Sequence, residues 1–579
     1  MPKVKVAESK EVNAVVTGVY PNRVQIEVKD IESFKVVGEK LSVGAYLRIS
    51  DSEDCAIVAV IQNFAIQKTE NNGDRKYIIE GVPIGFIDAN GIFSRGGNNI
   101  AIPPVGVTPA TKDDISKIYG KIPQEKKFIF SSLSQDISIK VPVDGDKFFN
   151  KHVAIVGSTG CGKSCVISTL IQRATSLKES GYQGLNNSHI VIFDLHGEYK
   201  TAFPSGHQLD INNLILPYWL MNGEELEELL VESGENQAYN QTSLLRRIIT
   251  RNKQKKTGQA KIFFDSPVHF SMKEVLNCIV NLTRETKDSK SPGKIMLKGA
   301  FKEFSNDDER FDYYFNQEFD FDESRQGSIS KGTYNDGTLE KFVSRIRTKL
   351  SDARLSFLFS DQAEKLPFED AIKNILGYNK NAEANVTVID LSGIPFEVLS
   401  ISVSLMSRIL FEFGYYLKRK NGNVKRKTPL FMVYEEAHKY VPKMAGAKYS
   451  ASRLSIERIA KEGRKYGVTL ALVTQRPSEI SETIFSQCNN FIAMRLTNPE
   501  DQSYVKRLLP DSLGPLTDTL PTLESGEAIL IGDSVVMPSL VKMDRASPEP
   551  SSSDIEYLQE WKKPWLEVDF GKIIGDWGK

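Results

Sequence analysis

The sequence predicts an α/β protein with a small β-barrel at its N-terminus and a helical insertion in its α/β core. Three observations predict this class. Short strands recur at regular spacing between residues 12 and 105, which is typical of a small barrel. An apolar strand at 153–156 leads through a glycine-rich loop into an amphipathic helix. Further apolar strands alternate with helical segments, as in a parallel sheet, at 188–194, 386–391, 429–434 and 468–474.

Length and charge set only broad limits. The chain has 579 residues, enough for about two to four domains. Hydrophobic residues are 40% and charged residues 26%, which is ordinary for a globular protein. Lysine plus arginine equals aspartate plus glutamate at 74 each, so the net charge neither favours nor excludes a nucleic-acid partner.

The cysteines and the N-terminus predict a cytoplasmic protein. The five cysteines are odd in number and form no CxxC pair, so we expect neither a disulfide framework nor a zinc knuckle. A reducing compartment suits this usage. Residues 1–12 lack the apolar segment of a signal peptide, and no run approaches the roughly 18 apolar residues of a membrane span, so we expect no membrane association.

The predicted barrel and its connector come first in the chain. Turns rich in Gly, Pro and Asn separate strands at 15–20, 24–28, 44–49, 55–60, 77–82 and 100–103. The barrel is either a collar for oligomerisation or partner docking, or a structural cap, and no visible chemistry separates the two. A connector follows at 106–150, with a helix at 111–118, strands at 128–130 and 137–141, and a turn at 144–146.

The loop after the strand at 153–156 is a predicted phosphate cradle. The pattern G-x-x-x-x-G-K-[ST] is complete in Gly157, Gly162, Lys163 and Ser164. Its backbone N–H groups and the following helix N-terminus would surround an anion. Lys163 would reach the β- and γ-phosphates of ATP, and the Ser164 hydroxyl would be a Mg²⁺ ligand. The predicted nucleotide-binding loop comprises Gly157, Ser158, Thr159, Gly160, Cys161, Gly162, Lys163, Ser164 and Cys165.

A second polar cluster and the insertion follow the cradle helix. The strand at 188–194 ends in Asp194, and Leu-His-Gly-Glu-Tyr follows it. The carboxyl ends of strands are where α/β sheets bind ligands, so this cluster is a candidate site, and a solvated turn is the alternative. The insertion, 217–337, has helices at 224–232 and 244–256, an acidic and aromatic stretch at 303–323 with a weak core signal, and a predicted mobile loop at 324–337. The basic run in 244–256 either touches DNA phosphates or, as we favour, is a solvated helix face.

Two later strands end in the residues that a nucleotide hydrolase needs besides a cradle. The strand at 429–434 ends in Glu435, which would lie near Mg²⁺, and Glu436, which would activate the attacking water. Glu435 departs from the usual Asp at this place. The strand at 468–474 ends in Gln475, which would sense the γ-phosphate. Arg458 and Arg464 precede that strand, and an arginine there can act across a subunit boundary. Strands at 491–496 and 528–532 complete the predicted sheet.

Eight motifs occur in order along the chain, namely GSTGCGKS, FDLHGEY, LPYWL, VIDLSGIPFEVLS, VYEEAH, IAKEGRKYG, TQRPSEIS and LTNPEDQSYV. Together they resemble the HerA family, hexameric DNA-translocating ATPases of the FtsK–HerA branch of RecA-like motors. The resemblance covers about 145–545, and the barrel is similar to the family's HAS barrel. It implies a HAS-type barrel at 1–110, a RecA-like ATPase core at 111–216 and 338–545, the helical insertion at 217–337 between them, and a C-terminal brace at 546–579.

The resemblance also implies roles for individual residues. Lys163 and Ser164 match the phosphate and Mg²⁺ residues. Asp194 matches a strand-end acid that hydrolysis requires, and Glu436 matches the catalytic glutamate. Arg464 matches the arginine finger supplied to a neighbouring subunit, and Gln475 matches the strand-end glutamine.

One position departs from the family, and two segments have expected contacts. The family often has Arg before the cradle strand as a second contact in trans, whereas this chain has Lys151, which cannot make a bidentate fork. The loop 439–448 is a candidate pore loop, with a surface loop as the alternative. The tail, with Trp561 and Trp565, is expected to brace a neighbouring subunit.

The implied assembly is a homohexamer with duplex DNA in its central pore, gripped through phosphates. It would move DNA for, or regulate, a partner nuclease or a sirtuin-like effector docked on the barrel face, with an anti-phage system as one setting. The alternative is a hexameric ATP-binding scaffold that controls an effector without substantial translocation. A conjugation or secretion pump is disfavoured because no membrane segment is predicted.

Overall fold

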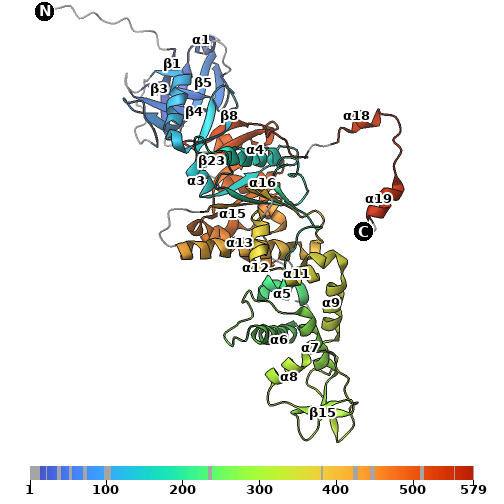
Figure 1. Ribbon diagram of the computed structural model, residues 1–579. Coiled ribbons are helices and arrows are strands. Elements are labelled where there is room, and N and C mark those ends of the chain that lie inside the picture. The colour runs from blue at the N-terminus through green and yellow to red at the C-terminus, as the bar shows by residue number, and fades with distance from the viewer. Residues whose placement is uncertain are drawn as a thin grey trace, which may run out of the picture.

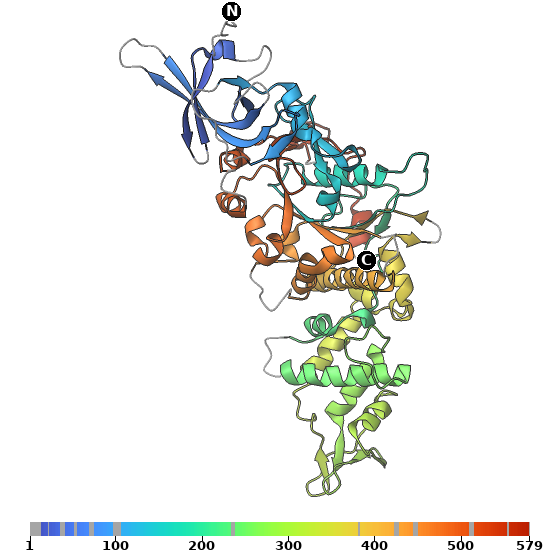
Figure 2. The same ribbon diagram turned by 90° about the vertical axis from the view of Figure 1, so that its left-hand side faces the viewer.

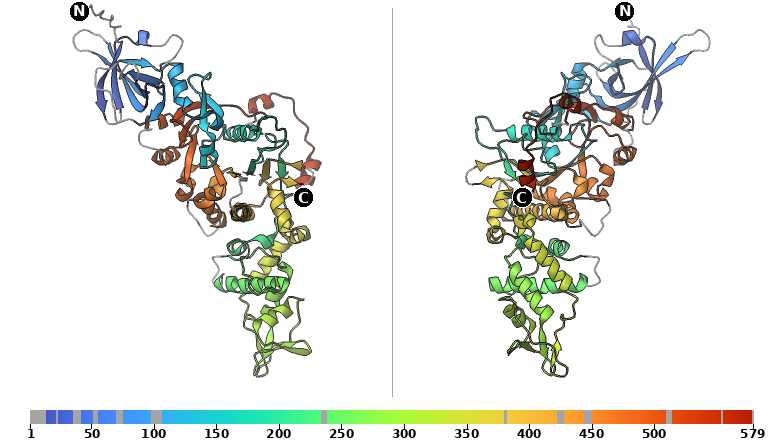
Figure 3. Two further views of the ribbon diagram at one scale, coloured as in Figure 1. Left: turned by 60° about the vertical axis from the view of Figure 1, so that its left-hand side comes forward. Right: turned by 90° about the vertical axis from the view of Figure 1, so that its right-hand side faces the viewer.

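The computed structural model describes residues 13–20, 23–34, 41–50, 55–68, 75–96, 106–232, 238–379, 382–421, 428–443, 450–508, 514–552 and 555–577. The molecule is elongated, with the N-terminal sheet at one end, the α/β core in the middle and the insertion at the other end (Figures 1, 2 and 3). No helix in these ranges combines the length and apolar character that a membrane crossing requires.

The N-terminal domain is a seven-stranded antiparallel sheet that curls on itself. Its strand order is β1-β2-β5-β4-β3-β7, with β6 paired to β5. An isolated bridge between Val15 and Gly106 brings the first strand to the residue before β7, as in a barrel. The elements are β1 (Ala14–Tyr20), β2 (Arg23–Val28), α1 (Ile31–Phe34), β3 (Tyr46–Ser50), β4 (Ala56–Lys68), β5 (Arg75–Ile87), β6 (Phe93–Arg95) and β7 (Val107–Pro109). The strand predicted at 100–103 lies outside the described residues.

The connector contains the predicted helix, but its second strand lies later than predicted. The helix α2 (Lys112–Gly120) begins with a capping box between Thr111 and Asp114, and the strand β8 (Lys127–Leu133) follows. The strand predicted at 137–141 is β9 (Lys140–Asp144), and Ile137 is 71% exposed in a turn. The predicted turn at 144–146 opens the short helix α3 (Gly145–Phe149), since the Asp144 side chain caps that helix.

The core is one eleven-stranded sheet, seven of whose strands are parallel neighbours. Its order is β12-β19-β11-β20-β21-β10-β22-β23-β24-β8-β9, and the pairs from β22 to β9 are antiparallel. The strands not yet given are β10 (His152–Val156), β11 (His189–Asp194), β12 (His207–Leu209), β19 (Val386–Asp390), β20 (Leu430–Tyr434), β21 (Val468–Thr474), β22 (Cys488–Ala493), β23 (Glu527–Gly532) and β24 (Ser539–Met543).

Both faces of the parallel region are covered, which is why its strands are uniformly apolar. In β10, Val153 and Ile155 belong to the apolar cluster that contains Val166 and Ile167 of α4 (Lys163–Ser176). Ala154 and Val156 belong to a second cluster, which contains residues of α13 (Phe396–Asn421) and α14 (Ser450–Glu462). The alternation of side chains along the strand therefore joins two helical layers to one sheet. Shorter helices complete the core at α15 (Glu482–Phe485), α16 (Pro499–Leu508) and α17 (Gly514–Thr517).

The sequence predicted a helical insertion, but the insertion also contains strands. Between its helices lies a four-stranded antiparallel sheet with the order β15-β14-β13-β16. The three-residue strand β16 falls within the predicted loop at 324–337, the rest of which is turns and irregular structure, and the mobility of that segment stays a prediction. The elements are α5 (Gly223–Leu230), α6 (Ala238–Thr257), α7 (Met272–Arg284), β13 (Thr286–Asp288), β14 (Lys294–Leu297), β15 (Ala300–Glu303), α8 (Asp307–Tyr314), β16 (Ile329–Lys331), α9 (Glu340–Ser351), α10 (Ser356–Phe359), α11 (Asp361–Lys365) and α12 (Phe368–Ile375).

Two further predictions for the insertion need correction. The stretch 303–323 has a strong core signal rather than a weak one, because Phe311, Tyr314 and Phe315 are buried. The basic run on α6 is used inside the insertion: Arg251 forms two hydrogen bonds with Asp312, and the buried Lys253 donates to backbone carbonyls. Other cations of the run pair with acids of α5, α7 and α8, namely Arg246 with Glu227, Arg247 with Asp307 and Lys256 with Glu274. The run therefore has a structural role that neither interpretation anticipated.

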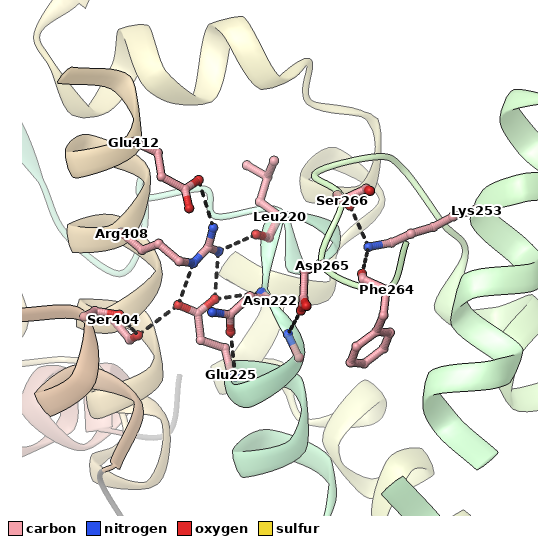
Figure 4. Close-up of polar contacts among 12 residues, drawn as sticks. Leu220, Asn222, Glu225, Lys253, Phe264, Asp265, Ser266, Ser404, Arg408 and Glu412 are labelled. Atoms are coloured by element: carbon pink, nitrogen blue, oxygen red, sulfur yellow. Dashed lines mark hydrogen bonds and ion pairs between the residues drawn. The ribbon is translucent and has the colours of Figure 1, made fainter. Parts of the chain in front are cut away.

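A buried ion pair anchors the insertion to the core. Figure 4 shows Arg408 of α13 facing Glu225 of α5, with Nε to Oε1 at 3.1 Å and Nη2 to Oε2 at 2.8 Å. Arg408 Nη2 also donates to the carbonyl of Leu220 at 2.6 Å, and the Ser404 hydroxyl donates to Glu225 Oε1. The Glu225 side chain is fully buried, and the apolar cluster of α13 continues around it into α5, α6 and α7. The insertion and the core thus form one packed unit at this junction.

Replacing Arg408 by leucine should destabilise this junction strongly. The substitution leaves Glu225 as an uncompensated buried charge, which costs about 3–5 kcal/mol. The measurement is the denaturant midpoint together with amide hydrogen exchange in α5. Replacing the exposed Arg354, which pairs with Asp352 at the surface, is the matched control and should change neither. Restoring neutrality with Glu225→Gln in the Arg408→Leu background should recover part of the loss. Equal midpoints for Arg408→Leu and wild type would contradict the anchoring role.

The C-terminal segment has two different parts. Residues 544–551 form a strap along α4, in which Ala546 N donates to Cys165 Sγ and the side-chain amide of Gln172 bonds the backbone of Ser547 and Pro548. Beyond the strap, α18 (Tyr557–Trp561) and α19 (Phe570–Trp577) extend away from the body (Figure 1). Trp565 between them is 95% exposed, and the exposed apolar side chains of the two helices are Tyr557, Leu558, Trp561, Phe570, Ile573 and Ile574.

Candidate nucleotide-binding site

The cradle lies at the carboxyl edge of the parallel sheet, directly after β10. Gly157 N donates to the carbonyl of Thr474 at 3.2 Å, and Ser158 N donates to the carbonyl of Arg495 at 2.7 Å. The loop is thus fastened to the ends of both neighbouring strands, β21 and β22. Gly160 and Gly162 have φ values of 72° and 100°, a region that side chains rarely allow. The backbone therefore turns back and α4 begins at Lys163.

Packing fixes the loop as firmly as its hydrogen bonds. A Cβ on Gly157 would lie 2.5 Å from Cys161 Sγ and 2.9 Å from Met494 Cβ, so only glycine fits there. Cys161 is buried beneath the loop, and burial raises the pKa of its thiol. Cys161 is thus a packing residue, and its backbone, not its side chain, belongs to the nucleotide loop.

The functional groups of the cradle bond to neighbours within the chain. Lys163 Nζ donates to the carbonyl of Ser158 at 3.1 Å, so the lysine folds over its own loop. The Thr159 hydroxyl donates to Gln475 Oε1 at 2.5 Å, which brings the tip of β21 to the cradle as expected. A phosphate group entering the loop would compete for Lys163 and lie beside Gln475.

Asp194 organises the loop that follows β11. Its Oδ1 accepts the backbone N–H groups of His196, Gly197 and Glu198 at 2.9–3.3 Å, and its Oδ2 accepts that of Tyr199 at 2.9 Å. The side chain is completely buried. Both oxygens are therefore engaged in holding the turn, and Asp194 acts on the site through the residues that it positions.

Glu435 faces Asp194 rather than Ser164. Its Oε2 accepts the backbone N–H of Leu195 at 3.1 Å. Burial raises the pKa of Glu435 well above its usual value, and the nearby charge of Asp194 raises it further. One Glu435 oxygen is thus engaged by the turn after β11, and the predicted role of Glu435 near the metal stays a prediction.

Glu436 lies beside the cradle in a strained backbone conformation. With φ 47° and ψ 48°, it is the one non-glycine residue with positive φ in the described ranges. Such a conformation costs about 1–2 kcal/mol, and strain of this kind concentrates at functional sites. His438 Nδ1 lies 3.2 Å from Glu436 Oε2. Burial alone would raise the pKa of Glu436, but His438 and the charge of Lys163 outweigh it, so the pKa is lowered. Glu436 is thus an ionised carboxylate, as a general base requires.

The structure adds one acid that sequence reasoning did not single out. The Ser164 hydroxyl donates to Glu198 Oε2 at 2.7 Å. Glu198 stands in the Leu-His-Gly-Glu-Tyr cluster that the sequence placed after the strand, and Gly197 before it has a φ of 70°.

Three predicted residues do not join the cradle within one chain. Lys151 precedes β10 and pairs with Asp533, and Arg458 stacks over the Phe411 ring at 4.8 Å. Arg464 precedes β21 and lies near His152 at the start of β10. Burial lowers the pKa of His152 to about 4, and the charge of Arg464 contributes to this lowering. A backbone hydrogen bond to Ala460 opposes the shift. The seven residues of β21 span roughly 23 Å, so Arg464 lies at the opposite edge of the sheet from the cradle.

The residues present fit ATP and Mg²⁺. The loop offers backbone N–H groups, a lysine and a helix N-terminus to the phosphates, and Ser164 and Glu198 offer oxygen atoms to the metal. Glu436 Oε2 is a buried acceptor whose neighbour is the His438 ring, and no hydrogen bond of good geometry reaches it within the described residues. The described residues contain no ready cluster of three metal-ligating side chains.

Two predicted contact segments are described only in part. Residues 444–448 of the candidate pore loop at 439–448 lie outside the described residues. Of its remaining part, Lys443 pairs with Glu482 at 2.9 Å. In the tail, Trp561 is exposed and packs only against Tyr557 of its own helix among the ring contacts of the described residues.

The chain is similar to known proteins over most of its length. The family model described as "Helicase HerA, central domain" matches residues 129–410. The DNA double-strand break repair helicase HerA of Saccharolobus solfataricus is 29% identical over 500 residues, covering 82% of this chain and 81% of that protein. The protein of the same name from Sulfurisphaera tokodaii is 27% identical over 488 residues, covering 83% and 81%. The solved structure of VirB4 from Thermoanaerobacter pseudethanolicus covers 74% of this chain and 99% of its own, with 13% identity and a TM-score of 0.46.

Proposed function

This chain carries the HerA central domain and is an ATPase of the FtsK–HerA type, and on that premise we propose that it assembles into a ring that moves duplex DNA. The observation that carries the proposal is the division of the predicted catalytic residues between two edges of one sheet. Lys163, Ser164 and Glu436 lie at the carboxyl edge, whereas Arg464 lies at the opposite edge. A complete site therefore needs the Arg464 edge of another copy.

The chemistry of the site follows from the residues of this chain. Lys163 and the loop N–H groups bind the phosphates, and Ser164 would hold Mg²⁺, which would supply positive charge to the phosphate groups. Glu436 takes the proton of the attacking water, and Gln475 lies where it can orient the γ-phosphate through Thr159. Arg464 of the next copy stabilises the charge that develops in the transition state.

The remaining parts of the chain receive roles by the same proposal. The sheet of residues 1–110 is a HAS-type barrel, 111–216 and 338–545 are the RecA-like core, and 546–579 is a brace. The exposed apolar side chains of α18 and α19 support a docking role for the tail on a second copy. Three parts of the proposal rest on the resemblance to the family: six subunits in the ring, duplex DNA in its central pore, and an effector on the barrel face.

Replacing Lys163 by alanine should remove ATP-driven DNA movement. The lost charge-assisted contact is worth about 1.5–3 kcal/mol, so nucleotide affinity should fall about 10–150-fold. The measurements are ATP affinity and the displacement of a third strand from a DNA triplex by the full-length chain. Lys200→Ala, which alters an exposed lysine in the next polar loop, is the matched control and should behave as wild type. Unchanged ATP turnover in Lys163→Ala would refute the site, and wild-type turnover without strand displacement would refute translocation.

A further inference from the structure

The Ser164 hydroxyl is hydrogen-bonded to the carboxylate of Glu198, which follows β11, and not to Glu435 or Glu436, which follow β20. Ser164 Oγ donates to Glu198 Oε2 at 2.7 Å, and this is a short bond to a charged acceptor. Glu435, where the sequence places the metal-side acid, directs its Oε2 to the backbone N–H of Leu195 instead. The acid that accepts the Ser164 proton is thus Glu198, for which the sequence predicted no role, whereas Glu435 contacts Leu195.

The Glu198 backbone is held by contacts on both sides. Asp194 Oδ1 accepts the Glu198 backbone N–H at 3.2 Å. On the other side, the carbonyl of Glu198 accepts the backbone N–H of Ser551 at 2.9 Å, and the Ser551 hydroxyl lies 3.2 Å from it. Gly197 supplies the left-handed turn between these contacts. The backbone at Glu198 is therefore held by both the strand end and the C-terminal strap.

A carboxylate in this position changes what Ser164 can offer to a metal. A serine hydroxyl that binds Mg²⁺ gives a lone pair to the ion and still has its proton to donate. A charged acceptor for that proton fixes the direction of the hydroxyl and increases the electron density on its oxygen. Such second partners of metal ligands typically contribute 10–100-fold to metal affinity or activity.

We propose that Glu198, rather than Glu435, is the positioning residue that orients the Ser164 hydroxyl toward Mg²⁺. The inference rests on the proposed ATPase function and specifies how its metal requirement is met. Glu198 acts through Ser164, and Asp194 acts through the backbone of Glu198. Glu435 then has a different task, to hold the Leu195 turn next to Asp194.

The test is the binding of a fluorescent ATP analogue by the full-length chain at increasing Mg²⁺ concentration, with a parallel titration in excess EDTA. Glu198→Ala should raise the half-saturating Mg²⁺ concentration about 10–100-fold and leave the EDTA affinity within a factor of about two. Glu198→Gln keeps an oxygen acceptor without the charge and should give a smaller shift. Glu524→Ala, which removes an exposed carboxylate from the segment beside the cradle, is the matched control.

Each contrary outcome has a distinct meaning. An unchanged Mg²⁺ requirement in Glu198→Ala would overturn the inference, and so would a shift of the same size in Glu435→Gln. If Glu198→Ala lost nucleotide binding equally with and without Mg²⁺, Glu198 would be a structural residue of the loop and the inference would also fail. Absence of nucleotide binding by the wild-type chain would instead refute the proposed function.

Discussion

Replacing Arg464 by alanine should reduce ATP turnover about 10³–10⁵-fold, the range typical of an arginine finger. ATP affinity should change little, because Arg464 lies at the edge of the sheet opposite the cradle and cannot touch a nucleotide bound by its own subunit. Turnover is measured in steady state, and affinity is measured by equilibrium binding of a fluorescent nucleotide. Arg464→Lys should remain strongly impaired, since lysine lacks the planar fork of the guanidinium. Lys461→Ala, which breaks a surface pair with Glu457 on the preceding helix, is the control and should retain turnover.

Mixing two inactive chains tests whether Arg464 acts across the subunit boundary. In a mixture of Arg464→Ala and Glu436→Gln subunits, some interfaces combine an intact Glu436 with an intact Arg464 from the neighbour. Partial turnover should therefore return. Two different affinity tags, purified in series, confirm that both chains occupy the same particle. Failure of such mixed particles to hydrolyse ATP would show that Arg464 serves its own subunit or has no catalytic role.

Glu436→Gln should retain ATP binding and lose about 10²–10⁴-fold in turnover, the usual contribution of a general base. The amide preserves the size and shape of the side chain but cannot accept the proton of the water. The pH profile provides an independent readout. Because the Glu436 pKa is lowered, wild-type activity should persist to a lower pH than a glutamate with an ordinary pKa would allow. The loss of activity on acidification should then follow protonation of this carboxylate. Glu500→Gln, at an exposed position on α16, should have no effect.

The same variant separates the motor from the scaffold. If Glu436→Gln binds ATP, assembles and still supports the full activity of a partner effector, the chain acts by assembly and not by translocation. If it assembles but leaves the effector inactive, hydrolysis is required. Wild-type turnover in Glu436→Gln would mean that another residue activates the water.

The cradle could be predicted from the sequence because short-range rules determine it. Gly157, Gly162, Lys163 and Ser164 follow an apolar strand and begin a helix, and these local constraints leave few other conformations. Gln475 and Glu436 were also expected at the same edge, since the carboxyl ends of parallel strands meet there. The proximity of Gln475 to Thr159, and of Glu436 to Lys163, agrees with that geometry.

What the sequence could not show depends on tertiary contacts or on very short elements. The roles of Glu198 and Glu435 are decided by which of them reaches Ser164, and no spacing rule encodes that. The small sheet of the insertion has strands of three or four residues without clear alternation. Its one local signal is the Lys298-Gly299 turn, in which Gly299 has a φ of 75°. The basic run on α6 was ambiguous because its acidic partners on α8 lie about 60 residues away in sequence.

The placement of the cradle and Arg464 on opposite edges of one sheet gives the assembly a polarity. Contact between two copies through these edges is heterologous, since the donor edge of one copy meets the acceptor edge of the next. Such a contact cannot close by two-fold symmetry, and it produces either a ring or an open helical filament. Only the angle between successive copies distinguishes these products. Substitutions that alter that angle, such as changes at the Lys151–Asp533 pair on the Arg464 edge, could thus leave each catalytic site intact and still prevent closure.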